Sequence, residues 1–119
     1  MLYLYDSRTG NTENFVKKLG VPATKITENM EVNEPFILFT YTTGFGETPK
    51  ITEKFVSNPI NSKNLYGTIV SGNNNWGLLY GKCGINIRNI TGKPCLYRFE
   101  ISGTREDVQN VKNILEAIK

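Results

Sequence analysis

The sequence predicts an α/β fold, a three-layer sandwich in which helices cover both faces of a five-stranded parallel sheet. Apolar segments typical of strands alternate along the chain with segments whose apolar residues recur at helical spacing. Several strand segments, residues 36–41 above all, are too apolar for a sheet with only one covered face. We expect one domain over residues 1–119, with the strand order 2-1-3-4-5.

The first half of the chain is expected to contain three strands and two helices. A strand at residues 2–5 leads into a helix, a weak strand follows at 23–26, and the central strand lies at 36–41. The next helix is expected to have Thr48 as its cap and Pro49 at its first helical position. Its buried face would then hold Ile51, Phe55 and Val56.

The second half is expected to contain two strands, each followed by a helix. The strands are predicted at residues 67–71 and 95–101. The first helix carries apolar residues at a spacing of four, Leu79, Cys83 and Ile87. The last helix is expected to begin at Thr104, which precedes Asp107 by three residues, as in a capping box with aspartate in place of glutamate.

Composition and charge favour a globular protein without a membrane or nucleic-acid partner. Hydrophobic residues make up 39% of the chain and charged residues 21%. No apolar run approaches the roughly 20 residues of a membrane-spanning helix. Because the chain begins directly with a strand, we expect a cytoplasmic protein. The net charge of +3 is dispersed without a basic block, which argues against nucleic-acid binding.

The chain contains no histidine and two cysteines that lie far apart in the sequence. This composition excludes the usual zinc spacings and any histidine-based triad or general base. We interpret Cys83 and Cys95 as small core residues, because free cysteine is commonly buried. The chain is therefore expected to supply no metal ligand and no catalytic side chain of its own.

A loop rich in hydroxyl groups joins the first strand to the first helix. A helix N-terminus offers unpaired backbone N–H groups and a partial positive charge, so an anion can bind there. The residues expected to hold a terminal phosphate are Ser7, Arg8, Thr9, Gly10, Asn11 and Thr12. Two alternatives stay open at this point. The loop could be an ordinary, well-capped turn instead of a phosphate site, and the Arg8 side chain could point to solvent instead of neutralising the phosphate.

Three further loops are expected at the same sheet edge, because ligands of open α/β sheets bind at the carboxyl ends of the strands. Each loop combines glycine with aromatic or amide side chains that could stack on a flat ring or bond its polar edge. The predicted ring-binding residues are Tyr41, Thr42, Thr43, Gly44, Phe45, Gly46, Asn73, Asn75, Trp76, Gly77, Phe99 and Glu100. A phosphate, a polyol and a flat polar heterocycle together describe FMN.

Four motifs resemble those of the NrdI family along the whole chain. They are Ser7-x-Thr9-Gly10-Asn11 and the segments 40–46, 71–77 and 99–104. The resemblance implies a flavodoxin-like FMN domain whose cofactor, and not a side chain, carries the chemistry. It further implies that reduced FMN converts dioxygen to superoxide or a related reduced oxygen species. This oxidant would serve to assemble the dimanganese-tyrosyl radical cofactor in the small subunit of class Ib ribonucleotide reductase.

Two other functions remain open from the sequence. One is a small flavodoxin that acts as a general electron shuttle, and the other is a non-redox module that binds a phosphate-bearing ligand. In either flavin-based function the chain is an accessory redox protein more than a metabolic enzyme. The reductant is not identified by any motif, and a monomer is assumed.

Overall fold

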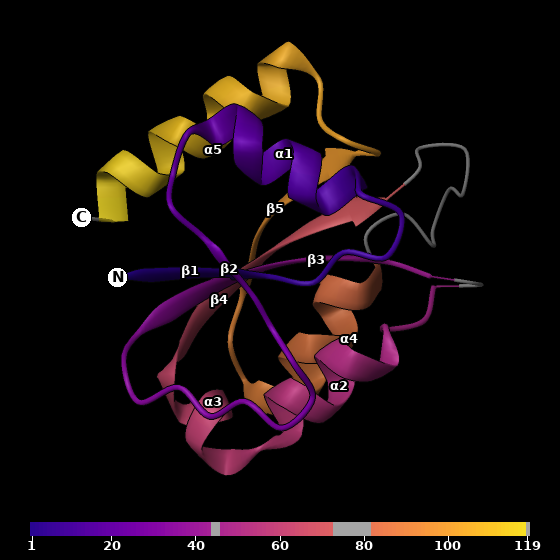
Figure 1. Ribbon diagram of the computed structural model, residues 1–119, viewed down its shortest axis with the longest axis vertical. Helices are drawn as coiled ribbons and strands as arrows, with labels where there is room; N and C mark the ends of the chain where they lie inside the picture. The colour runs from indigo at the N-terminus through magenta and orange to yellow at the C-terminus, as the bar shows by residue number, and fades with distance from the viewer. Residues whose placement is uncertain (44–45, 73–81, 119) are drawn as a thin grey trace.

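The computed structural model describes residues 1–43, 46–72 and 82–118 and has the predicted three-layer architecture (Figure 1). The strands are β1 (Leu2–Tyr5), β2 (Thr24–Lys25), β3 (Phe36–Tyr41), β4 (Leu65–Gly72) and β5 (Cys95–Glu100). They form one parallel sheet in the order β2-β1-β3-β4-β5, which confirms the predicted topology. The helices are α1 (Asn11–Leu19), α2 (Lys50–Ser57), α3 (Pro59–Asn64), α4 (Lys82–Thr91) and α5 (Arg105–Ile118).

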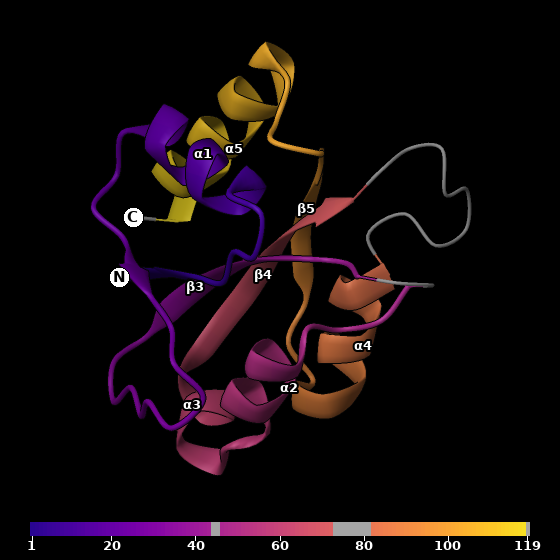
Figure 2. The same cartoon turned by 45° about the vertical axis from the view of Figure 1, so that its right-hand side comes forward.

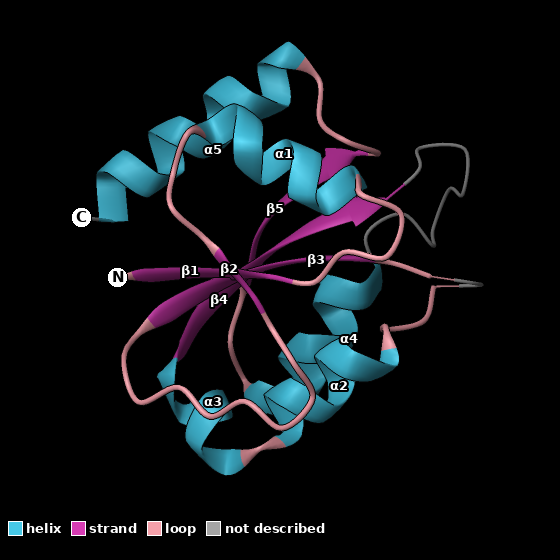
Figure 3. Ribbon diagram, in the orientation of Figure 1, coloured by secondary structure: helices cyan, strands magenta, loops and turns pink. Residues whose placement is uncertain are grey.

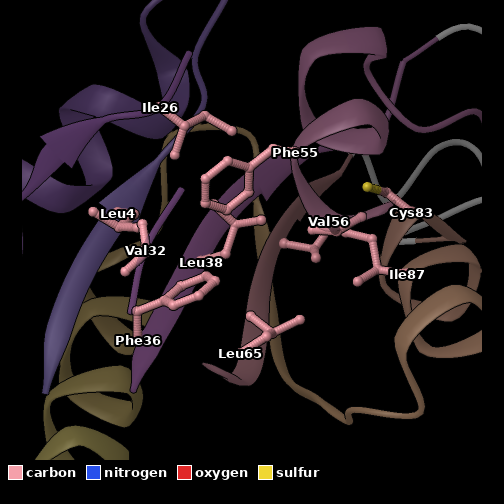
Figure 4. Packing of buried hydrophobic residues seen from close by; sticks show 11 residues of the cluster. Leu4, Ile26, Val32, Phe36, Leu38, Phe55, Val56, Leu65, Cys83 and Ile87 are labelled. Atoms are coloured by element: carbon pink, nitrogen blue, oxygen red, sulfur yellow. The ribbon is translucent and has the colours of Figure 1, made fainter. Parts of the chain in front are cut away.

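The helices cover the two faces of the sheet in unequal numbers. Helices α1 and α5 lie on one face, and α2, α3 and α4 lie on the other (Figure 3). Side chains of β3 alternate between these faces, as the period of two requires. Phe36 and Leu38 pack with α2 and α4 (Figure 4), whereas Ile37 and Phe39 pack with α1 and α5. All four are fully buried, so β3 is the central strand that its apolar sequence predicts.

The capping box predicted for the last helix is present at the start of α5. The Asp107 N–H donates to Thr104 Oγ1 at 3.0 Å, and the Thr104 N–H donates to Asp107 Oδ2 at 3.0 Å. A shorter aspartate can therefore take the role that glutamate usually has. The helix start is fixed by the sequence at this point.

The prediction for α2 was wrong in two respects. Thr48 forms no cap, because Pro49 stands at the N-cap position and the helix begins at Lys50. Ile51 is 41% exposed, and the buried face is formed by Thr52 with Phe55 and Val56. The polar Thr52 takes the buried position because its hydroxyl finds partners in the sheet, as described below.

Helix α3 was not predicted. Asn58 caps it by accepting a hydrogen bond from the Ile60 N–H at 2.9 Å, and Pro59 stands at its first position. The fully buried Asn61 accepts from the Val32 N–H at 2.7 Å. This short helix therefore depends on contacts with a distant segment of the chain.

Both cysteines are free thiols, Cys83 buried and Cys95 half-buried. Burial raises the pKa of the Cys83 thiol to about 12, the neighbouring Thr48 hydroxyl opposing the rise in part. The thiol is neutral at physiological pH and packs as a core residue, as predicted. The other residue predicted on this helix face, Leu79, lies outside the described residues. No helix in the described part of the chain has the length and apolar character to cross a membrane.

Candidate functional site

A cavity of about 410 Å³ opens at the carboxyl ends of β1, β3, β4 and β5. This is the edge of the sheet at which the predicted site residues were expected to meet (Figure 2). The predicted residues that line the cavity are Ser7, Arg8, Thr9, Asn11, Thr12, Tyr41, Thr42 and Thr43. The structure therefore brings the first loop and the end of β3 together around one space.

The loop after β1 closes around the hydroxyl of Ser7. Ser7 Oγ accepts hydrogen bonds from the N–H groups of Gly10 at 3.2 Å and Glu13 at 3.3 Å. Gly10 has φ 92° and stands at the N-cap of α1, a conformation that favours glycine. Because both acceptor sites of the Ser7 hydroxyl are used, its own proton remains for an acceptor in the cavity.

Thr12 carries the clearest sign of an absent partner. Its side chain is only 1% exposed, and Oγ1 has no hydrogen-bond partner among the described residues. A buried hydroxyl without a partner is costly unless a ligand or water completes it. Because Thr12 lines the cavity in the first turn of α1, an oxyanion such as a phosphate fits there.

A buried polar network fixes the strand end beneath this loop. Asp6 is 3% exposed, and its Oδ2 accepts a hydrogen bond from Thr52 Oγ1 at 2.6 Å. Thr52 Oγ1 lies 2.8 Å from Thr40 Oγ1, and since the Thr52 proton is used on Asp6, the Thr40 hydroxyl is the donor. The network links β1, β3 and α2 directly under the site.

Tyr41 places its half-buried phenol at the end of β3. Burial raises its pKa, the negative charge of Asp6 raises it further, and the positive charge of Arg8 opposes the rise. The phenol therefore remains neutral and can donate a hydrogen bond or offer an aromatic face at physiological pH.

The ends of the following loop are paired with each other. The Thr43 N–H donates to the Glu47 carbonyl at 2.9 Å, and the Glu47 N–H donates to the Thr43 carbonyl at 2.7 Å. The Asn86 side chain of α4 donates to the Gly46 carbonyl at 3.0 Å. Both stems of the loop are thereby fixed beside the cavity.

Other predicted residues lie elsewhere or outside the described residues. Phe99 is fully buried and stacks on Phe15 at a centroid distance of 3.9 Å, so it supports the site from within the core. Glu100 is half-buried at the end of β5, and Arg8 is exposed at the cavity. The predicted residues outside the described part are Gly44, Phe45, Asn73, Asn75, Trp76 and Gly77.

Three lining residues lie within the motif segments 71–77 and 99–104 but were not predicted as binding residues, namely Ser71, Gly72 and Ile101. Ser71 and Gly72 are the last residues of β4, and Ile101 directly follows β5. Their position at strand ends was a usable signal, because the argument from sheet topology applies to the last strand residues as well as to the loops.

The chain matches the family model described as "NrdI Flavodoxin like" over residues 3–113. The SPbeta prophage-derived protein NrdI of Bacillus subtilis (strain 168) is 41% identical over 111 residues, which cover 90% of this chain and 84% of that protein. Protein NrdI of Escherichia coli (strain K12 / DH10B) is 39% identical over 119 residues, with 93% of this chain and 88% of that protein covered.

A solved structure agrees with the fold. A short-chain flavodoxin associated with a non-canonical PDU bacterial microcompartment superposes with a TM-score of 0.70, covering 98% of this chain and 95% of that chain at 18% identity. The likeness confirms the flavodoxin-like architecture. The family match over residues 3–113 and the relatives at about 40% identity show that this chain belongs to the NrdI flavodoxin-like family, flavoproteins associated with the activation of ribonucleotide reductase.

Proposed function

We propose that this chain is an FMN protein that delivers a reduced oxygen species to the small subunit of a class Ib ribonucleotide reductase. When bound, the reduced flavin supplies the chemistry, the conversion of dioxygen to superoxide or a related species for assembly of the dimanganese-tyrosyl radical cofactor. The chain binds and orients the cofactor and controls the access of dioxygen to it. Family membership and the unpartnered Thr12 hydroxyl support this proposal.

The loop after β1 is the proposed phosphate site, which selects FMN over a flavin without phosphate. The Thr12 hydroxyl and the remaining Ser7 proton supply two side-chain donors, and the N-terminus of α1 adds backbone donors and a partial positive charge. The exposed Arg8 adds a full positive charge at the cavity. These groups would bind a dianion more tightly than a neutral alcohol.

The residues at the end of β3 are proposed to bind the remainder of the cofactor. Tyr41, Thr42 and Thr43 line the cavity. The predicted ring contacts in the loops at 44–46 and 73–77, and that of Glu100, stand as part of the same proposal, whereas Phe99 supports the site from the core. Dioxygen and a separate reductant would complete the cycle, which we place in the cytoplasm.

A phosphate-selective binding measurement tests the cofactor. FMN and riboflavin differ only in the phosphate, and quenching of flavin fluorescence gives the dissociation constant of each. Thr12→Val preserves the side-chain shape and removes the hydroxyl, so we expect FMN to bind roughly ten- to a hundredfold more weakly. Riboflavin affinity should not change. An equal loss for both flavins would contradict the phosphate assignment.

The oxygen chemistry requires a second measurement. The FMN-loaded protein is reduced anaerobically, mixed with dioxygen, and assayed for a product that superoxide dismutase removes. The same mixture with the manganese-loaded small subunit should give a tyrosyl radical by electron paramagnetic resonance. Flavin binding without either product would favour the electron shuttle, and a protein that retains no flavin would favour the non-redox module.

A further inference from the structure

The turn after β5 contains an unusual backbone conformation. Ile101 has φ 53°, and it is the only non-glycine residue with positive φ in the described part of the chain. A β-branched residue in this region is a steric outlier. The Gly103 N–H donates to the Glu100 carbonyl at 2.7 Å, so Ile101 is the second residue of a β-turn. Glycine normally takes a positive-φ position of this kind.

The strained residue is held from β4. The Ile101 N–H donates to the Gly72 carbonyl at 2.8 Å, and Ser71 Oγ donates to the Ile101 carbonyl at 2.5 Å. Both backbone groups of Ile101 are thus fixed by the last two residues of the neighbouring strand. Figure 1 shows the end of β4 beside the start of this turn.

The rest of the turn is anchored on both sides. Asp107 Oδ2 accepts from the N–H groups of Glu100 and Thr104, each at 3.0 Å. Lys18 of α1 donates to the carbonyls of Ser102 at 3.1 Å and Gly103 at 3.2 Å. Strained residues persist where their surroundings determine them this completely, and they cluster at ligand sites.

The turn leaves an exposed apolar residue at the cavity. Ile101 lines it, yet the side chain remains 44% exposed, so an apolar group is presented to open space at the edge of the site. A fully buried position would explain an isoleucine by packing, and a solvent-facing turn would favour glycine or asparagine. Neither explanation fits a strained, half-exposed isoleucine at a cavity.

We propose that Ile101 is a flavin-contact residue, an apolar wall against the uncharged part of the cofactor, and that Ser71 is the residue that positions it. The inference rests on the proposed function, because it assigns a contact to the same cofactor. Chemistry separates this contact from the phosphate site: an aliphatic side chain gains by covering apolar ring surface and gains nothing from a dianion.

Substitution of Ile101 tests the contact. Ile101→Gly and Ile101→Asn both accept positive φ, so they relieve the backbone strain while removing the apolar wall. We expect the dissociation constants of FMN and riboflavin to rise by the same factor, roughly five- to tenfold. The melting temperature of the flavin-free Asn variant should stay equal or rise by a few degrees. Thr12→Val is the matched contrast, because its loss should be confined to FMN.

The role of Ser71 is tested by a double-mutant cycle. Ser71→Ala should weaken both flavins roughly threefold, because the Ile101 carbonyl loses its donor and the side chain is less well placed. Ser71→Ala combined with Ile101→Gly should bind flavin no more weakly than Ile101→Gly alone. Independent, additive losses would overturn the positioning role.

The outcomes separate this inference from the proposed function. Unchanged flavin affinity in both Ile101 variants, with the wild type binding normally, would overturn the contact and leave the function intact. A loss of flavin-free stability in both variants would show that the turn serves only to connect β5 to α5, and would also overturn it. A wild type that binds neither flavin would overturn both proposals together.

Discussion

The loop after β1 and the turn after β5 reach the same cavity, but they satisfy their polar groups in different ways. In the turn, the protein itself binds the backbone of Ile101 on both sides, through Gly72 and Ser71. In the loop, Thr12 Oγ1 is buried without a partner among the described residues. The turn is therefore complete without a ligand, whereas in the proposed function the loop is completed by the phosphate of the cofactor.

The layers beneath these segments differ in the same sense. The turn lies over an apolar layer, where Phe15 of α1 stacks on Phe99 of β5 with an interplanar angle of 9°. The loop lies over the polar network of Asp6, Thr40 and Thr52. Close packing fixes the shape of one wall, and directional hydrogen bonds fix the other. The comparison predicts that each wall fails for its own reason, steric crowding or an unsatisfied polar group.

The largest effect is expected where the turn meets the aromatic layer. A Cβ atom at Gly103 would lie 2.1 Å from Cδ1 and 2.6 Å from Cε1 of Phe15, and Gly103 has φ +88°. Gly103→Ala therefore adds a clash with a fully buried ring to backbone strain. We expect the free energy of unfolding to fall by about 4 kcal/mol, measured by urea denaturation.

Gly92→Ala is the matched control for the backbone term. Gly92 has φ +75°, and nothing lies within 4 Å of its added Cβ atom. This variant should lose only about 1 kcal/mol, the cost of positive φ alone. Equal losses at Gly103 and Gly92 would show that the Phe15 ring can move to accommodate the added methyl group, so that the apolar layer is less rigid than its packing indicates.

The next effect concerns the polar network beneath the loop. Thr52→Val keeps the side-chain shape but removes the donor to Asp6 and the acceptor of Thr40, both buried. We expect a loss of about 2 kcal/mol in the free energy of unfolding, because a buried carboxylate loses a hydrogen bond. Thr52→Ser retains the hydroxyl and serves as control. If the Val variant were as stable as the Ser variant, the hydrogen bonds of the network would not contribute to the stability of the protein.

Much of this architecture could be predicted because its determinants are local. The alternating faces of β3 follow from a strand that is apolar throughout, and the start of α5 follows from the spacing of Thr104 and Asp107. The first loop was assigned to the site because hydroxyl-bearing residues stand between a strand and a helix. Each of these signals lies within a few neighbouring residues.

The features that were missed depend on partners distant in the sequence. Thr52 is buried because its hydroxyl bonds to Asp6, 46 residues earlier in the chain, and α3 is stabilised by the hydrogen bond between Asn61 and Val32. The conformation of Ile101 contradicts the local preference of isoleucine and is imposed by β4. A reading of propensities cannot recover a conformation that tertiary contacts impose against them.

The smallest effect is a pH dependence at the anchor of the turn. Asp107 Oδ2 accepts from the Glu100 and Thr104 N–H groups, and Oδ1 accepts from the Tyr97 hydroxyl at 2.7 Å. Burial acts to raise the pKa of this carboxyl, but the hydrogen bonds from Thr104, Glu100 and Tyr97 outweigh it and lower the pKa below its usual value of 3.8. The charged carboxylate is therefore the form that the folded protein favours.

The sign of the pH effect follows from linkage. A lowered pKa in the folded state stabilises the protein at pH values above the unfolded pKa, and this contribution is lost as the pH falls through the folded pKa. Asp107→Asn removes the titration, and we expect it to cost about 1 kcal/mol at pH 7, as for the loss of a cap. The difference between wild type and variant, followed by urea denaturation, should shrink below about pH 4. A difference that stays constant to pH 2 would mean that the protonated carboxyl stabilises the turn as well as the carboxylate does, and the turn would then be fixed by hydrogen-bond geometry without a contribution from charge.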